Sequence, residues 1–347
     1  MVAEAVALLG PGPWNREALA RAGWTRRQVD RSIEAGRLVR VRRGALAPSD
    51  TERPTDTVAA DGTASAADAP PWAGDHPARM LELRAVLDAV SPSAVVSHAS
   101  AADLHGLWTP GRGSTLIHLT VPGQSERTSG GVRVHGSRLR PQHVEIVHGV
   151  RVTSMARTAI DLARGRALAD ALVPLDSALR LLAHGSDQRR RPLLASVRDP
   201  EAVAWARDGL ERALADVWSW PGTRVVRRGL DMASALSESA FESWSRGWME
   251  LDGLPRPCLA HHVLGASGAS FVSDFAWLEQ RVLGEADGLG KYGASPQEFR
   301  DRLLAERRRQ HDLEAAGWRV VRWTTGERPR SFLNRLARTL AAPGPLE

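Results

Sequence analysis

The chain has 347 residues, of which 43% are hydrophobic and 25% are charged. A chain of this length predicts about two to four globular units, and its composition excludes an intrinsically disordered protein. The formal net charge of +6 permits a polyanionic partner such as DNA.

Cysteine, lysine and long apolar segments are nearly absent. Cys258 is the only cysteine, which excludes a disulfide framework and is typical of a reducing cytosol. Lys291 is the only lysine, so almost all basic charge is arginine. No segment approaches the roughly 18 apolar residues that a membrane span needs, and the N-terminus lacks the basic region of an export signal. We expect a soluble cytoplasmic protein with no membrane partner.

Residues 1–48 predict a winged helix-turn-helix domain. Helices are expected at Val2–Leu9 and after the N-cap Asn15, and a third helix opens with the capping box Thr25-Arg26-Arg27-Gln28. Two short strands follow within Leu38–Leu46. Three helices followed by a small basic ribbon are typical of DNA-binding winged helices.

Basic side chains cluster on both elements with which such a domain contacts DNA. We expect these side chains to bind DNA from the third helix and from the wing. In the alternative, the segment is a small helical cap whose arginines are solvated. The residues concerned are Arg26, Arg27, Arg31, Arg40, Arg42 and Arg43.

The run from 18–24 through 36–44 resembles the N-terminal domain of the AbiEi-type antitoxins of type IV toxin–antitoxin systems. The resemblance implies a module that binds operator DNA, with a cognate toxin as a candidate partner. Ala45 stands where that family usually carries an aromatic residue after the wing glycine.

The middle of the chain predicts three segments. Residues 49–77 contain almost no large apolar side chains and are expected to be a flexible linker. Residues 78–165 predict an α+β domain, and residues 166–235 a helical connector. The domain that follows the winged helix in AbiEi-like proteins is similar to the runs 97–102, 104–107, 152–154 and 157–162. This resemblance implies antitoxin function and no chemistry.

Two groups of middle residues are interpreted as structural. His98 and His105 lie seven apart on one face of an expected helix, but no Cys, Asp or Glu supports them as metal ligands at helical spacing. We interpret both as packing or hydrogen-bonding residues. The core or helix-packing aromatics are expected to be Trp205, Trp218 and Trp220.

The C-terminal part is organised around a predicted β-hairpin. Residues 271–277 and 281–287 pair about a turn at Glu279–Gln280, which places Asp274 opposite Glu285. Directly opposed residues of an antiparallel pair lie about 4.5–5.5 Å apart, and two like charges there repel. A positive partner is therefore expected, and a divalent metal ion is the natural candidate.

Residues 236–345 predict the order helix, three strands, helix, strand, helix. With the acids of the hairpin, this order resembles the PD-(D/E)XK nuclease fold, a restriction-endonuclease-like α/β domain, and within it the DUF559 domain and the Vsr-type endonucleases. The expected fold class is therefore multidomain, α+β and α/β. The resemblance rests on the runs 241–246, 273–276, 284–288, 291–293 and 316–323.

The nuclease resemblance implies roles for individual residues. Asp274 and Glu285 match its metal-binding acids, and Glu242 matches the acid of its first helix. Asp287 stands in the place of the family's lysine, which leaves open a third metal ligand or a loss of catalysis. Lys291 is the candidate substitute, because lysine can orient or deprotonate water and arginine cannot.

The implied reaction is hydrolysis of DNA phosphodiester bonds assisted by Mg²⁺ or Mn²⁺. Asp274, Glu285 and Asp287 would hold the ion. In the alternative, the acids are solvated or paired with arginines. Backbone phosphates would be clamped by Arg308, Arg309 and Arg322.

Three classes of function follow. The first is an endonuclease guided by its own winged helix, acting in phage defence or DNA repair. The alternative is a non-catalytic AbiEi-like antitoxin or transcriptional regulator that binds DNA and keeps a degenerate nuclease fold. The third is an interaction protein whose winged helix docks a toxin.

Overall fold

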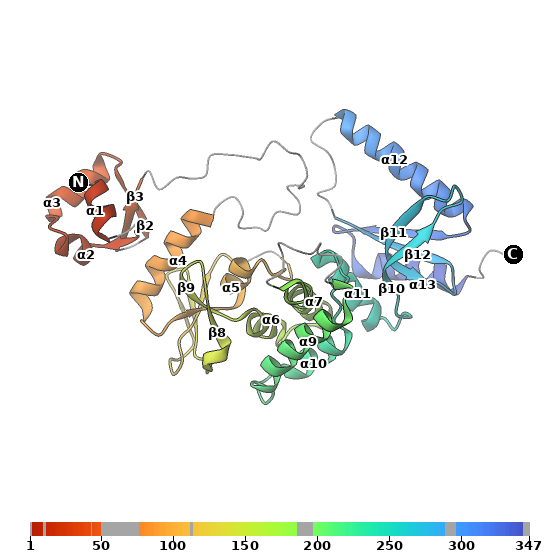
Figure 1. Ribbon diagram of the computed structural model, residues 1–347, viewed down its shortest axis with the longest axis horizontal. Helices are drawn as coiled ribbons and strands as arrows, with labels where there is room; N and C mark the ends of the chain where they lie inside the picture. Colours follow the sequence, from red (N-terminus) through yellow and green to blue (C-terminus); the bar gives the residue numbers. More distant parts are fainter. Residues whose placement is uncertain are drawn as a thin grey trace. The chain divides into compact units, whose positions relative to one another are not determined.

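The computed structural model describes residues 2–9, 12–42, 44–49, 76–111, 114–185, 197–288 and 296–342. It contains two compact units, residues 1–106 with 114–154 and residues 107–113 with 155–347. Figure 1 shows the chain coloured from red at the N-terminus to blue at the C-terminus. Among the described helices, none is long and apolar enough to cross a membrane. The predicted linker 49–77 lies almost wholly outside the described residues. The boundaries of the five predicted segments remain predictions.

The first part of the first unit combines three helices with a small antiparallel sheet of order β1-β3-β2. Two helix starts follow the sequence signals. Asn15 accepts a hydrogen bond from the Ala18 amide (2.7 Å), and Thr25 and Gln28 form the expected capping box. The winged-helix assignment itself stays a proposal. The elements are α1 (Val2–Leu9), α2 (Arg16–Arg21), α3 (Arg26–Glu34), β1 (Trp14–Asn15), β2 (Leu38–Arg42) and β3 (Ala45–Pro48).

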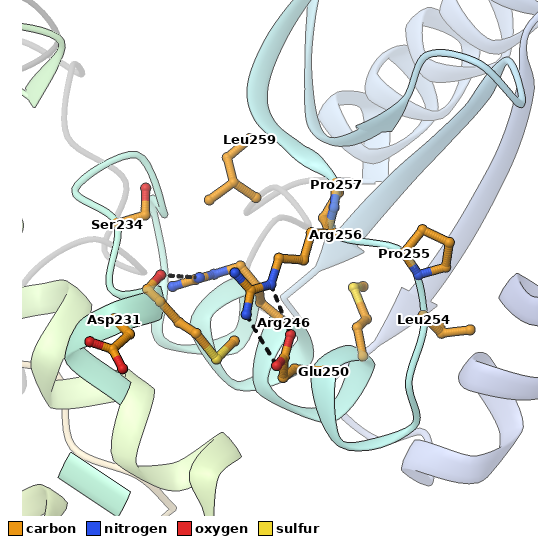
Figure 2. A pocket seen from close by; sticks show the side chains of 11 residues that line it. Asp231, Ser234, Arg246, Glu250, Leu254, Pro255, Arg256, Pro257 and Leu259 are labelled. Carbon is orange, nitrogen blue, oxygen red and sulfur yellow. Dashed lines mark hydrogen bonds and ion pairs between the residues drawn. The ribbon is translucent and has the colours of Figure 1, made fainter. Parts of the chain in front are cut away.

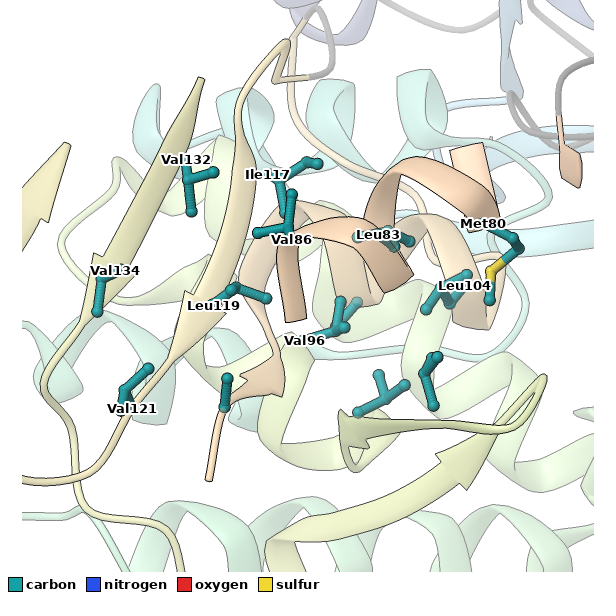
Figure 3. Close-up of a cluster of buried hydrophobic side chains, with 14 residues drawn as sticks. Met80, Leu83, Val86, Val96, Leu104, Ile117, Leu119, Val121, Val132 and Val134 are labelled. Atoms are coloured by element: carbon teal, nitrogen blue, oxygen red, sulfur yellow. The ribbon is translucent and has the colours of Figure 1, made fainter. Parts of the chain in front are cut away.

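The second part of this unit is a six-stranded sheet of order β6-β7-β5-β4-β9-β8. One face packs Leu119 and Val134 into an apolar core with Leu83 of the long helix α4 (Figure 3). Because side chains alternate along a strand, His118 and His135 lie on the opposite face. The elements are α4 (His76–Val90), β4 (Val95–Val96), α5 (His98–His105), β5 (Ile117–Thr120), β6 (Arg127–Ser129), β7 (Val132–His135), the 3-10 turn η1 (Pro141–His143), β8 (Val144–Val147) and β9 (Val150–Thr153).

The second unit begins with a helical layer around α7, which is buried along most of its length. The helices α6, α9, α10 and α11 all pack against it or against one another. The helical character of this region agrees with the apolar spacing in the sequence. The bounds are α6 (Met155–Ala163), α7 (Leu168–His184), α9 (Pro200–Ala215), α10 (Thr223–Met232) and α11 (Ala240–Leu251).

The expectation that Trp205 and Trp218 belong to the core was wrong. Their exposed fractions are 61% and 66%. Trp205 lies on α9, which turns Ala206 and Leu210 inward instead, and Trp218 follows the end of that helix. Trp220 packs under a guanidinium group, with the Arg157 carbon 4.7 Å from its ring centroid.

A four-stranded sheet of order β10-β11-β12-β13 completes the second unit. Its first three strands are antiparallel, and β13 joins β12 in parallel. Phe275, Trp323 and Phe332 lie in the core that α11 and α13 cover, whereas Leu283 packs with Leu313 of α12 on the other face. The bounds are β10 (Cys258–Leu264), β11 (Ser270–Trp277), β12 (Val282–Asp287), α12 (Pro296–Ala315), β13 (Arg319–Thr324) and α13 (Pro329–Ala341).

The β11–β12 hairpin has the register predicted from its sequence. Phe275 pairs with Gly284 and Trp277 with Val282, as a turn centred on Glu279–Gln280 requires. One step further along this register stand the two acids that were expected to oppose each other. The prediction of the hairpin register is therefore confirmed.

A buried ion pair joins α7 to α11. One Arg246 nitrogen lies 2.7 and 2.6 Å from the two carboxylate oxygens of Asp176, which is 0% exposed. The same carboxylate accepts hydrogen bonds from the Ser234 amide (2.9 Å) and the Ser237 hydroxyl (3.1 Å). These short, charge-assisted hydrogen bonds compensate Asp176 and Arg246 for the loss of their contacts with water.

We expect Asp176→Ala to lower the free energy of unfolding by about 3–5 kcal/mol, because it leaves the Arg246 guanidinium buried without its partner. Urea unfolding of the full chain measures this loss. The control is Asp208→Ala, which breaks the exposed pair with Arg212 (2.6 Å) and is expected to cost less than about 1 kcal/mol. Similar losses in the two variants would contradict the structural role of the buried pair.

Candidate functional site

The outer face of α3 carries exposed arginines. Val29 is buried against the core, and Arg26, Arg27 and Arg31 are exposed on α3. Of the wing arginines, Arg40 is exposed and Arg42 half-buried, while Arg43 lies outside the described residues. The predicted DNA-binding residues of α3 therefore reach solvent together.

One acid interrupts this basic face. Asp30 binds Arg16 at 2.7 Å and lies 3.9 Å from Arg26. The hydrogen bond from Arg16 lowers the pKa of Asp30. Arg26 is thus partly neutralised within the protein, and Arg27 and Arg31 are the more suitable side chains for an external polyanion.

Glu242 lies in the first turn of α11 and is 8% exposed. The Ser239 hydroxyl donates to its Oε1 (2.7 Å), and the Glu238 amide donates to its Oε2 (2.7 Å). Burial raises the pKa of Glu242 to about 7, and the negative charge of Asp274 adds to this effect. The carboxyl group is therefore poised between its two protonation states near neutral pH.

Asp274 and Glu285 come from the two hairpin strands. Asp274 Oδ2 accepts a hydrogen bond from the Ala286 amide (2.8 Å). Glu285 is 4% exposed, and its Oε1 lies 2.7 Å from Arg309 of α12. Burial raises the pKa of Glu285 to about 7, and the charge of Asp274 raises it further, against the opposing charges of Arg309 and Arg322.

The predicted site acids interact electrostatically, but their oxygens do not form a compact metal site. Asp274 acts on both Glu242 and Glu285, and Asp287 ends the same strand as Glu285. Their oxygen donors are of the type that Mg²⁺ prefers. Within the described residues, however, no three of these carboxylates bring ligand oxygens within 4.8 Å of one another. Lys291 lies outside the described residues.

The arginines expected to clamp phosphates lie beside these acids. Arg309 binds Glu285, as described above. Arg322 pairs with Glu306 and lies 3.8 Å from Asp287. Arginine partners of this kind are the alternative to a metal ion that the sequence indicates. The remaining predicted phosphate ligand, exposed on α12, is Arg308.

A pocket opens beside α11 (Figure 2), but Glu242, Asp274, Glu285 and Asp287 are not among the residues that line it. Arg246 and Arg256 contribute its basic groups. Arg256 donates two hydrogen bonds to Glu250 (3.1 and 3.2 Å), and the hydrogen bond from Arg256 lowers the pKa of Glu250. Asp176 pairs with Arg246, and Glu250 pairs with Arg256. The pocket is therefore separate from the predicted metal-binding acids.

Sequence reasoning missed a group of three histidines. His98, His118 and His135 each offer a ligand atom within 4.8 Å of the others. His98 was compared only with His105, whose Nε2 instead contacts the Thr153 carbonyl (2.7 Å). The alternation in β5 and β7 places both histidines opposite the apolar face, but it does not show that the two strands pair.

We expect the free energy of unfolding to fall as the pH rises, because two buried carboxyls hold their protons in the folded state. Glu242 and Glu285 have folded pKa values of about 7 against an ordinary value of 4.5. Between these values the folded state binds more protons than the unfolded state, so the slope is negative. In Glu242→Gln the decline between about pH 5 and pH 8 should be smaller by about 1–3 kcal/mol. Urea unfolding at several pH values measures it, with Glu279→Gln in the exposed turn as the control.

In comparisons with known proteins, one family model matches residues from both units. Residues 93–212 match the family model described as the AbiEi antitoxin C-terminal domain. Two proteins of Mycobacterium tuberculosis are each 29% identical over 301 residues, which is 86% of this chain and 89% of each relative. Their names are "Uncharacterized protein MT2308" in strain CDC 1551 / Oshkosh and "Uncharacterized protein Rv2248" in strain ATCC 25618 / H37Rv. The antitoxin match includes β4 to β9 and most of the helical layer around α7.

Proposed function

We propose that the chain is a DNA-binding regulator of the AbiEi antitoxin type. The observation that carries this proposal is the match of residues 93–212 to the AbiEi antitoxin C-terminal domain. It is supported by the position of three helices and a basic ribbon ahead of that region, which is the order expected when a winged helix precedes an antitoxin domain. A cognate toxin is the second proposed partner.

In this proposal α3 and the β2–β3 ribbon form the surface that contacts DNA. Arg27 and Arg31 lie one helical turn apart, so they reach the same stretch of backbone. Arg40 extends the basic surface onto the ribbon. Arginine contacts to phosphates release counterions, which makes such binding strongly dependent on salt.

The regulator proposal also accounts for the acids of the C-terminal sheet. Arg309 pairs with Glu285 and Arg322 lies 3.8 Å from Asp287, so two of the acids have arginine partners within the protein. Ser239 caps α11 by accepting a hydrogen bond from the Glu242 amide (3.1 Å), and its hydroxyl donates to the Glu242 carboxylate (2.7 Å). Both arrangements stabilise the fold whether or not the domain catalyses a reaction.

We expect the double variant Arg27→Ala, Arg31→Ala to lose affinity for DNA from the region upstream of its own gene. The slope of log K against log salt should fall by about 2, one unit for each lost phosphate contact. Fluorescence anisotropy over a range of salt concentrations measures both quantities. The matched control removes the same charge from α10, as Arg224→Ala, Arg227→Ala. No binding by the wild-type chain, or equal losses in both double variants, would count against the proposal.

Metal-dependent hydrolysis of DNA is the second candidate function. The observation that favours it is the presence of two buried carboxyls with pKa values of about 7 beside Asp274, since strongly perturbed acids gather at catalytic sites. Asp274, Glu285 and Asp287 are the proposed ligands of Mg²⁺ or Mn²⁺, which would supply a Lewis acid when bound. Because Arg309 holds Glu285 in the arrangement described, we assign no reaction step to the ion.

Asp274→Asn separates the two candidate functions. If the protein is a nuclease, the wild type should nick or cut plasmid, linear duplex or single-stranded DNA with Mg²⁺ or Mn²⁺, and the variant should lose at least about 100-fold in rate. Glu279→Gln, in the turn of the same hairpin, should keep the wild-type rate. DNA binding without cleavage by the wild type, across all these substrates and both ions, excludes the second candidate.

A further inference from the structure

Three histidines from three different elements converge in the first unit. His98 begins α5, His118 lies in β5 and His135 ends β7. Each offers a ligand atom, and these atoms all lie within 4.8 Å of one another. No other group of three His, Cys, Asp or Glu side chains is this close in the part of the chain that the structure describes.

The nitrogen spacing suits a small metal ion. His118 Nδ1 and His135 Nε2 are 3.1 Å apart, and the rings of His98 and His135 stack at a centroid distance of 3.7 Å. Two imidazole nitrogens bound to one tetrahedral Zn²⁺ at about 2.0–2.1 Å lie about 3.3 Å from each other. The His98 and His135 rings are nearly parallel, with 14° between their planes, so one ring must rotate out of the stack before both nitrogens can point at one ion.

The opposite nitrogens of His98 and His118 each have a hydroxyl partner, and a carboxylate lies near that of His135. His98 Nδ1 lies 3.0 Å from the Ser97 hydroxyl, and His118 Nε2 lies 2.9 Å from the Ser114 hydroxyl. His135 Nδ1 lies 3.9 Å from a carboxylate oxygen of Glu126. Histidines that bind metals almost always have such a partner on the second nitrogen, which fixes the tautomer and the orientation of the ring.

The backbone also holds the cluster in place. His98 has a φ of +50°, a left-handed conformation that a residue with a side chain rarely adopts and that costs free energy. The Ser97 amide donates to the His118 carbonyl (3.0 Å), and β5 pairs in parallel with β7. His135 is 7% exposed, while His98 and His118 are half-buried.

We propose that His98, His118 and His135 bind a divalent transition-metal ion of the Zn²⁺ class. The ligand atoms are His118 Nδ1, His135 Nε2 and His98 Nε2, and a water molecule completes a tetrahedral site. Imidazole ligands favour Zn²⁺ and its neighbours over Mg²⁺ or Ca²⁺. The site lies within the antitoxin-matched residues 93–212 and is separate from the carboxylates of the second unit.

The bound ion would link α5, β5 and β7. These elements are distant in sequence, so an ion that binds only the folded state stabilises their arrangement. With the ion at about 100 times its dissociation constant, we expect the melting temperature to rise by about 5 °C or more. The geometry thus assigns the ion a role in holding the sheet, whether or not it also activates its bound water.

The test uses the full chain without a polyhistidine tag, stripped with EDTA and passed through metal-free buffer. Co²⁺ is the probe, because tetrahedral Co²⁺ absorbs visible light and reports its coordination directly. We expect about one equivalent to bind with the spectrum of tetrahedral nitrogen ligands, and Zn²⁺ to displace it. His118→Gln and His135→Gln should each abolish the spectrum while keeping the circular dichroism of the wild type.

Two further variants sharpen the result. Glu126→Gln, which removes an exposed charge 3.9 Å from His135 Nδ1, should weaken Zn²⁺ binding by less than about 10-fold without changing the ligand set. His311→Gln, which removes an exposed histidine of α12, should bind Co²⁺ and Zn²⁺ as the wild type does. The proposal fails if the folded wild type shows no tetrahedral Co²⁺ spectrum, or if a folded His118→Gln or His135→Gln variant retains it. In that case the three rings form a hydrogen-bonded cluster only.

Discussion

The buried pair of Asp176 and Arg246 is the interaction on which the second unit depends. Asp176 lies on α7, within the region that matches the antitoxin domain, and Arg246 lies on α11, the helix that opens the C-terminal sheet domain. A buried charge that loses its partner is strongly unfavourable, so the two helices keep a fixed relation. Glu242 stands one turn before Arg246, and an ion pair outside the acid cluster therefore sets the position of its first acid.

At Glu285, burial and the charge of Asp274 raise the pKa, whereas the charges of Arg309 and Arg322 lower it. Arg309 attracts the ionised form of Glu285, yet burial and the neighbouring Asp274 keep its pKa at about 7. In a regulator, the arginines would remain the partners of these acids. In a hydrolase the same balance means that a metal ion competes with Arg309 for Glu285. The two proposed functions therefore differ in which cation the acids hold.

The features that could be predicted from the sequence are those set by near neighbours. The capping box of Thr25 and Gln28 and the register of the β11–β12 hairpin each depend on a few consecutive residues. The histidine cluster depends on the parallel pairing of β5 with β7, an order of strands that alternating hydrophobicity does not specify. Arg309 reaches Glu285 across 24 residues of chain, through packing of α12 on the sheet. Trp205 was misplaced because its size suggested burial, whereas α9 buries smaller side chains.

The path of the chain through the two units has a further consequence. Residues 107–113 belong to the second unit, although the chain returns to the first for residues 114–154. Within residues 107–113, the Trp108 amide donates a hydrogen bond to the Ser177 hydroxyl of α7 (3.0 Å). No single break in the chain therefore yields two complete units. A single crossover in the coding sequence would therefore divide one of the two units rather than separate them.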